Sequence, residues 1–233
     1  GAINIYNSKI RMQNFEINGG KKLHGEIEVN GSKNATVAIL AASVLNEGIT
    51  TLRNVPQIEE VNRWVEVLES IGMQIKRKGK TLTLKAPKTI EIKKINREAA
   101  EKTRSAIMLM SSLAGKFRKY SIPQAGGCKL GARTVKPHLF VLENFGIKIK
   151  AKEDCFEVDA GKFNKAGKVV LYESGDTVTE SALMAAAQIP EETTIKMATS
   201  NYMVQVLCFF LEKLGVKISG IGGTTLKVEG LKK

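Results

Sequence analysis

The sequence predicts an α/β protein in which one unit of about 70 residues occurs three times. The signal is the pattern LExxGxxI, which occurs at residues 68–75, 142–149 and 211–218. Each occurrence predicts a helix that ends on a left-handed glycine and is followed at once by a strand.

The elements around each glycine recur in the same order. Helices rich in small residues are predicted at 34–45, 104–113 and 179–187, and short strands follow them at 49–52, 120–122 and 193–197. A hairpin follows the glycine, as in 74–76 with 81–85. The unit is therefore strand-helix-strand-helix-strand-strand, with copies at about 25–88, 89–162 and 163–230. The small-residue helices are apolar on nearly all sides and should be buried, whereas the amphipathic helices that end on the glycines should lie outside.

Composition excludes several classes of protein. The chain has 233 residues, 43% of them hydrophobic, and no apolar run long enough to span a membrane. Its three cysteines, at 128, 155 and 208, are odd in number and far apart, which argues against a disulfide framework. With only two histidines as well, we expect no metal site, no cofactor and a reducing, cytoplasmic location.

The net charge of +13 favours anionic partners, although a lysine-rich solvated surface would give the same value. Aromatic residues make up 6% of the chain, and no block of consecutive basic residues is present. We therefore expect no nucleic-acid partner, because a basic face with stacking aromatic side chains is missing.

Lys33 is the first candidate for binding an anion. In the segment 29–35, Ser32 can cap the first small-residue helix, which leaves Lys33 beside free backbone N–H groups. A capped turn with a solvated lysine is the alternative. Arg104 begins the second small-residue helix and so occupies the position that Lys33 has in the first unit. It should face the same central cleft.

Cys128 is the candidate reactive group. Glycines surround it at 126, 127 and 131, which predicts an exposed loop, and Lys129 and Arg133 are near enough to lower its thiol pKa. Such a thiol can act as an acid, a base or a nucleophile, although a loop cysteine without a role is the alternative.

These motifs resemble those of the enolpyruvyl transferases, in particular the branch that acts on UDP-N-acetylglucosamine. Residues 31–35 are similar to the family's Gly-(Ala/Ser)-Lys-Asn-Ala signature, 102–106 to its Lys-x-Arg-Ala-Ser, and 123–133 to its Pro-Gly-Gly-Cys-x-Ile-Gly-Ala-Arg-Pro loop. The resemblance implies an inside-out α/β barrel with three buried helices. It also implies transfer of the enolpyruvyl group of phosphoenolpyruvate to a nucleotide sugar, the first committed step of peptidoglycan precursor synthesis.

The resemblance also implies roles for single residues. Cys128 would lie on a mobile lid, give a proton to phosphoenolpyruvate, form a covalent adduct with it and react with fosfomycin. Phosphoenolpyruvate would contact Lys33, Asn34 and Arg133. The nucleotide sugar would contact Arg104, Arg133, Thr134, Val135, Lys136 and Pro137.

Two departures from the family leave the acceptor open. Thr134 and Lys136 replace the proline and the acidic residue that the family has after its arginine. In the segment 173–180, only Thr179 and Glu180 match the family's stretch that contacts phosphates and sugar. Another anionic acceptor, such as shikimate 3-phosphate, or a non-catalytic anion-binding domain, remains an alternative.

The resemblance divides the chain into three parts. We expect residues 1–11 to be a tag remnant or an N-terminal extension, and 12–32 to be leading strands that belong partly to a second domain missing from the chain. Residues 33–233 form the enolpyruvyl transferase domain. Because the family's active site lies between two domains, we expect the isolated chain to be inactive or weakly active.

Overall fold

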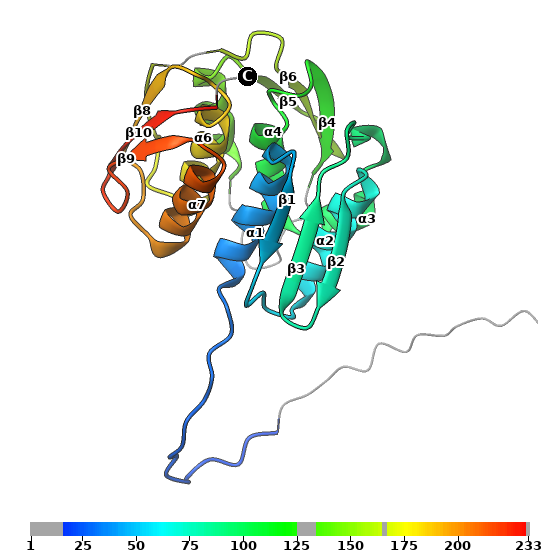
Figure 1. Ribbon diagram of the computed structural model, residues 1–233, viewed down its shortest axis with the longest axis vertical. Coiled ribbons are helices and arrows are strands. Elements are labelled where there is room, and N and C mark those ends of the chain that lie inside the picture. Colours follow the sequence, from blue (N-terminus) through cyan, green and yellow to red (C-terminus); the bar gives the residue numbers. More distant parts are fainter. Residues whose placement is uncertain (1–15, 125–133, 165–166, 232–233) are drawn as a thin grey trace, which may run out of the picture.

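The computed structural model describes residues 16–124, 134–164 and 167–231. Three β-sheets surround a central group of helices (Figure 1). The elements up to the first hairpin are α1 (Lys33–Ala42), η1 (Ser43–Leu45), β1 (Ile49–Leu52), α2 (Glu59–Ser70), β2 (Gln74–Lys78) and β3 (Thr81–Lys85). The next are η2 (Ile92–Lys94), α3 (Arg97–Glu101), η3 (Arg104–Met108), α4 (Leu109–Ser112), β4 (Lys119–Pro123), α5 (Lys136–Asn144), β5 (Lys148–Ala151) and β6 (Cys155–Asp159). The last are β7 (Lys168–Val170), α6 (Asp176–Ala186), β8 (Glu192–Lys196), α7 (Tyr202–Lys213), β9 (Lys217–Ser219) and β10 (Thr225–Glu229).

The strand orders of the sheets are β1-β3-β2, β4-β6-β5 and β7-β8-β10-β9. All neighbouring strands are antiparallel except β7 and β8. Over the described residues no strand of one sheet pairs with a strand of another. The sheets therefore do not form the closed barrel that the family resemblance implied. The edge strands β2, β5 and β9 are lysine-rich and mostly exposed, which suits strands that face water. The threefold repeat remains a prediction from the sequence.

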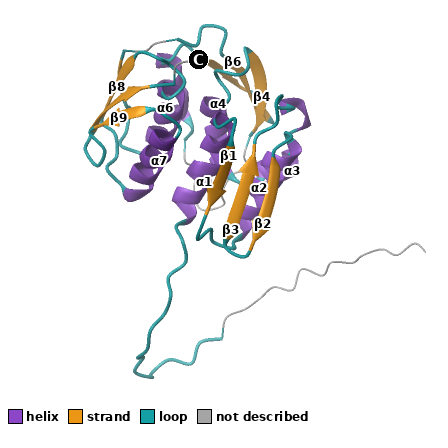
Figure 2. Cartoon of the chain, in the orientation of Figure 1, coloured by secondary structure: helices purple, strands orange, loops and turns teal. Residues whose placement is uncertain are grey.

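The strand predicted at the start of each unit forms in one place only. β7 precedes α6 as expected, whereas η2 and α3 occupy the start of the second predicted unit. Residues 16–32 have no helix or strand, and Figure 2 shows them as a loop that leads away from the body. The strands expected within 12–32 are therefore absent from the part of that segment that the structure describes.

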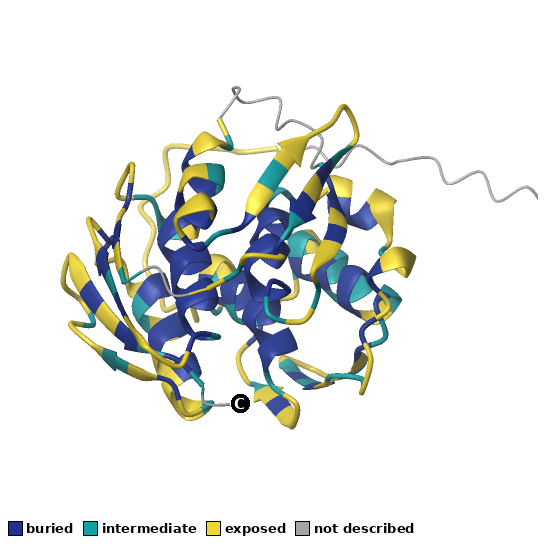
Figure 3. Ribbon diagram, turned by 90° about the horizontal axis from the view of Figure 1, so that it is seen from above, coloured by how far each residue is buried: buried dark blue, intermediate teal, exposed yellow. Residues whose placement is uncertain are grey.

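The small-residue helices are buried, as predicted (Figure 3). Ala38, Leu40, Ala41 and Ala42 of α1 are fully buried, and α1 packs against η3, α4 and α6. Short side chains allow this close approach. The helix predicted over 104–113 is instead divided into the 3-10 helix η3 and the short helix α4. No helix in the described ranges is long and apolar enough to cross a membrane.

The three glycine caps share one local structure, which confirms the prediction for the helix ends. Gly72, Gly146 and Gly215 have φ angles of 99°, 78° and 102°. The residue after each glycine donates its N–H to the carbonyl of the motif's leucine, at 3.0, 3.1 and 3.2 Å. These bonds satisfy carbonyls that a helix end leaves free and turn the chain directly into the next strand.

Candidate functional site

Three of the buried helices, α1, η3 and α6, begin at the same cleft. The first residues of α1, η3 and α6 border a cleft of about 790 Å³. The residues that line it are Lys33, Asn34, Val37, Glu60, Arg104, Ser105, Ile107, Thr134, His138, Glu173, Ser174, Gly175, Asp176, Thr177, Glu180 and Asn201. The cleft thus joins segments that lie far apart in the sequence.

Ser32 places Lys33 at the cleft. Its Oγ accepts the N–H of Ala35 at 3.2 Å, which confirms the predicted helix cap, and lies 3.0 Å from the Oη of Tyr202. The preceding residue, Gly31, lets the backbone lie close to Asn54, because a Cβ at position 31 would lie 1.9 Å from the carbonyl oxygen of Asn54. Lys33 then becomes the first helical residue, beside the positive end of α1.

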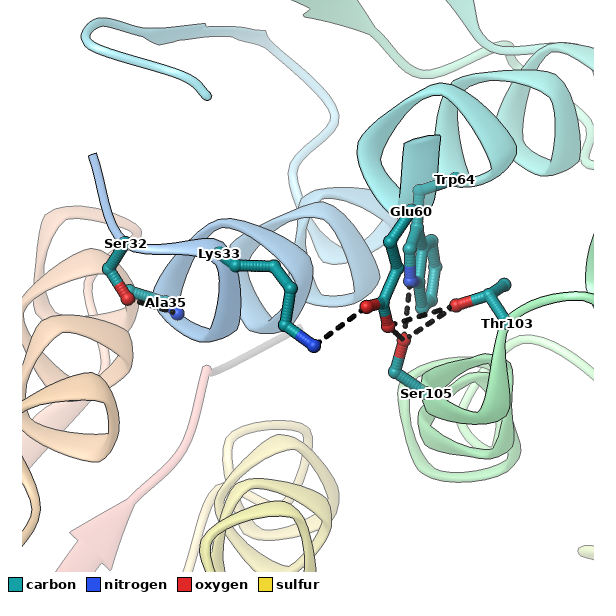
Figure 4. Close-up of polar contacts among 7 residues, drawn as sticks. All are labelled: Ser32, Lys33, Ala35, Glu60, Trp64, Thr103 and Ser105. Atoms are coloured by element: carbon teal, nitrogen blue, oxygen red, sulfur yellow. Dashed lines mark hydrogen bonds and ion pairs between the residues drawn. The ribbon is translucent and has the colours of Figure 1, made fainter. Parts of the chain in front are cut away.

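Lys33 pairs with a glutamate that the sequence did not single out. Its Nζ lies 2.8 Å from Oε2 of Glu60, which comes from α2 (Figure 4). Burial alone would raise the pKa of Glu60, but the hydrogen bond and charge of Lys33, with hydroxyls from Ser105 and Thr103, bring the pKa below its usual value. Glu60 is therefore a carboxylate at neutral pH.

The other oxygen of Glu60 faces a buried polar cluster. Oε1 accepts hydrogen bonds from Ser105 Oγ at 3.0 Å and Thr103 Oγ1 at 3.2 Å. Nε1 of Trp64 donates to the same Ser105 Oγ at 2.7 Å (Figure 4). Trp64 is fully buried and Thr103 nearly so, which protects these bonds from water.

In the sequence, Arg104 stands between Thr103 and Ser105, and its side chain lines the cleft. Its Nη2 donates to the carbonyl oxygen of Thr134 at 3.5 Å, and Thr134 also lines the cleft. Val135, Lys136 and Pro137 do not line it: they lie at the start of α5, where Pro137 is buried. The roles of these three residues in binding a nucleotide sugar remain predictions.

His138 is a cleft residue that the sequence did not identify as a candidate. Its Nδ1 lies 3.1 Å from Ser181 Oγ, and its Nε2 lies 3.1 Å from Thr177 Oγ1. Burial, with the nearby charge of Arg104, lowers the pKa of His138 to about 4. The ring is therefore neutral at neutral pH and links α5 to α6 by hydrogen bonds.

The part of the cleft that α6 lines carries two acidic residues, Asp176 and Glu180. Asp176 begins α6, where a negative charge is favourable, and its Oδ1 accepts a bond from Asn201 Nδ2 at 2.7 Å. Glu180 is 1% exposed, and its Oε1 accepts no hydrogen bond from any residue that the structure describes. Burial, with the charge of Asp176, raises the pKa of Glu180 to about 8, so this carboxyl is largely protonated at neutral pH.

Several of the residues predicted from the sequence therefore meet in one cleft. Lys33, Asn34, Arg104 and Thr134 all line it. Cys128 and Arg133 lie outside the described residues, and their roles stay predictions. Within the described ranges, no group of histidine, cysteine, aspartate and glutamate could hold a metal ion.

Comparison with known proteins gives the family. Residues 17–233 match the family model of EPSP synthase (3-phosphoshikimate 1-carboxyvinyltransferase). The chain is 32% identical to UDP-N-acetylglucosamine 1-carboxyvinyltransferase 2 of Caldanaerobacter subterraneus subsp. tengcongensis, over 95% of this chain and 53% of that protein. It is 33% identical to UDP-N-acetylglucosamine 1-carboxyvinyltransferase of Treponema denticola, over 95% of this chain and 52% of that protein.

Solved structures have the same fold. The enolpyruvyl transferase NikO from Streptomyces tendae matches with a TM-score of 0.78 and 19% identity, over 91% of this chain and 50% of that one. EPSP synthase from Acinetobacter baumannii matches with a TM-score of 0.66 and 17% identity, over 90% and 47%. The chain therefore belongs to the enolpyruvyl (carboxyvinyl) transferase family. It spans about half the length of the curated relatives that it matches.

Proposed function

We propose that this chain forms part of the active site of an enzyme that transfers the enolpyruvyl group of phosphoenolpyruvate to UDP-N-acetylglucosamine. The observation that carries the proposal is the convergence of Lys33, Asn34 and Arg104 from two helix starts on one cleft. The names of the curated relatives support this choice of acceptor.

Each described residue has a chemical task in this proposal. The ammonium of Lys33 and the N-terminus of α1 bind the anionic groups of phosphoenolpyruvate, and Asn34 adds a neutral hydrogen-bonding group. The guanidinium of Arg104, which also lines the cleft, binds the anionic acceptor, because its planar donors match phosphate oxygens. By the family resemblance, the thiol of Cys128 gives a proton to phosphoenolpyruvate, and Arg133 adds a second cation.

The test combines an assay for phosphate release with labelling of the thiol. Fosfomycin should add to Cys128, as seen by mass spectrometry, and both substrates together should slow the addition. The chain alone should release little or no phosphate from the two substrates, because the proposal assigns the remaining catalytic groups to a second domain. Labelling that ignores the substrates, or normal turnover by Cys128→Ala in a form of the enzyme with both domains, would contradict the proposal.

A second acceptor, shikimate 3-phosphate, is favoured by the description of the matching family model. The labelling of Cys128 also decides between the acceptors. Under the first proposal, UDP-N-acetylglucosamine changes the rate at which fosfomycin labels Cys128 at a lower concentration than shikimate 3-phosphate does. The reverse order would favour the second acceptor.

A further inference from the structure

Glu60 lies at the junction of three elements. Its carboxylate comes from α2, Lys33 approaches it from α1, and Ser105 and Thr103 approach it from η3 and from the residue before η3 (Figure 4). One oxygen accepts from the ammonium, and the other accepts from the two hydroxyls. Donors on both oxygens fix the carboxylate, because no rotation of the side chain would keep all three bonds.

The fixed carboxylate in turn limits where Lys33 can point. The side chain of Lys33 is 49% exposed, and a lysine on the protein surface normally samples many rotamers. A charge-assisted bond of 2.8 Å selects one of them and holds the ammonium on the cleft wall. The four-residue cluster of Glu60, Ser105, Thr103 and Trp64 is therefore a rigid support for a cation that faces the ligand.

One member of this cluster, Trp64, can be followed by itself in an NMR spectrum through its indole N–H. Trp64 is the only tryptophan of the chain, and its indole N–H donates to Ser105 Oγ. The Ser105 hydroxyl in turn donates a hydrogen bond to Glu60, so the strength of that bond affects the oxygen that the indole contacts. Hydrogen bonds in such a series polarise one another in a buried environment.

We propose that Glu60 is a positioning residue that aims the ammonium of Lys33 into the cleft and transmits the state of Lys33 to Trp64 through Ser105. The inference rests on the proposed function for one point, that phosphoenolpyruvate binds at Lys33. An anion on Lys33 takes part of the ammonium's hydrogen bonding away from Glu60. Glu60 then becomes a better acceptor for Ser105, and the indole proton of Trp64 should respond.

The experiment follows the single indole cross-peak in a ¹H–¹⁵N spectrum of the 233-residue chain. Phosphoenolpyruvate is added to the parent chain, with sodium chloride at matched ionic strength as the salt control. We expect the indole peak to move and to saturate at the same concentration as the backbone amides of Lys33 and Asn34. In Glu60→Gln and in Ser105→Ala, these amides should still move, while the indole peak should not.

Glu59→Gln is the matched control. Glu59 precedes Glu60 on α2, pairs with Arg63, and does not line the cleft. This variant should behave as the parent does. An indole peak that moves equally in Glu60→Gln, or that stays still in the parent while the amide of Lys33 titrates, would overturn the inference.

A second measurement needs no ligand and so separates the inference from the proposed function. Lys33→Met removes the ammonium but keeps much of the side-chain length. It should shift the indole peak in the parent background and leave it in place in the Glu60→Gln background. Equal shifts in both backgrounds would refute the role of Glu60 even if phosphoenolpyruvate binds. Failure of phosphoenolpyruvate to bind the parent, with the expected difference between backgrounds, would refute only the proposed ligand.

Discussion

Two glutamates on the walls of one cleft have pKa values that are displaced in opposite directions. Glu60 has a lysine and two hydroxyls around its carboxylate, and these partners outweigh the effect of burial. Glu180 is more deeply buried, and both this burial and the negative charge of Asp176 raise its pKa. At neutral pH the cleft is therefore lined by one carboxylate, Glu60, and one largely neutral carboxyl, Glu180.

The protonation of Glu180 predicts how stability depends on pH. Its folded-state pKa of about 8 lies above the ordinary value of 4.5, so the folded state keeps a proton that the unfolded state releases between these limits. Stability from this group is full below pH 4.5 and falls as the pH rises to 8, by up to about 4 kcal/mol. Glu180→Gln should remove this loss.

The measurement is urea denaturation of the parent and Glu180→Gln at both ends of that pH range. The variant should lose less free energy of unfolding than the parent between the two pH values. Glu153→Gln, at an exposed position, is the control and should follow the parent. Parallel curves for the parent and Glu180→Gln would show that the carboxyl is already ionised in the folded protein.

At the scale of elements, the three glycine caps have the same backbone but different surroundings. A Cβ at Gly146 would lie 2.1 Å from the carbonyl oxygen of Lys162, whereas at Gly215 its nearest neighbour would be a side-chain carbon of Leu231 at 3.5 Å. Both glycines have positive φ, so alanine at either position costs about 1 kcal/mol from backbone strain. Only at Gly146 does a backbone carbonyl also have to move.

Gly146→Ala should therefore destabilise the protein clearly more than Gly215→Ala does. We expect about 1 kcal/mol for Gly215→Ala and about 3 kcal/mol or more for Gly146→Ala, because a strained φ and a steric clash add. The free energy of unfolding from chemical denaturation measures both. Equal losses would mean that the chain at Lys162 shifts without cost.

The same elements show what sequence can predict. The caps at Ser32 and Gly72 were predictable, because each depends on residues within one helical turn. The bond from Trp64 to Ser105 was not, because it joins residues 41 positions apart and each residue alone has an ordinary packing role. Glu60 follows another glutamate at the start of an amphipathic helix, a position that usually faces water. Strands within 12–32 were expected from the resemblance, yet a strand also needs a partner for its backbone groups, and no strand pairs with residues 16–32 within the described ranges.

For the whole molecule, the overall charge and the charge of the cleft differ. The chain carries +13, but the described lining of the cleft has the cations Lys33 and Arg104 beside the acidic residues Glu60, Glu173, Asp176 and Glu180. The excess of lysine therefore lies mostly elsewhere on the surface. It can draw anions towards the molecule over a long range, while binding in the cleft depends on how its two cations are held.

Residues 16–30 and the body of the molecule should be energetically almost independent. Ile17, Leu23, Ile27 and Val29 are each more than 80% exposed, so they gain little from burial in this chain. The segment's ion pair, from Glu28 to Lys80 at 3.1 Å, is exposed and contributes at most about 1 kcal/mol. Gly31 and Ser32, by contrast, are fitted to the body through Asn54 and the cap of α1.

In a chain that begins at residue 16, removal of residues 16–30 should therefore change the free energy of unfolding by less than about 1 kcal/mol. Urea denaturation of the chains that begin at residues 16 and 31 measures this difference. Ser32→Ala in the shortened chain is the control, because loss of the helix cap should cost about 1 kcal/mol and shows that the assay detects a local contact. A loss of several kcal/mol on shortening would mean that the segment's apolar side chains pack against the body in solution, and that α1 depends on residues beyond its own cap.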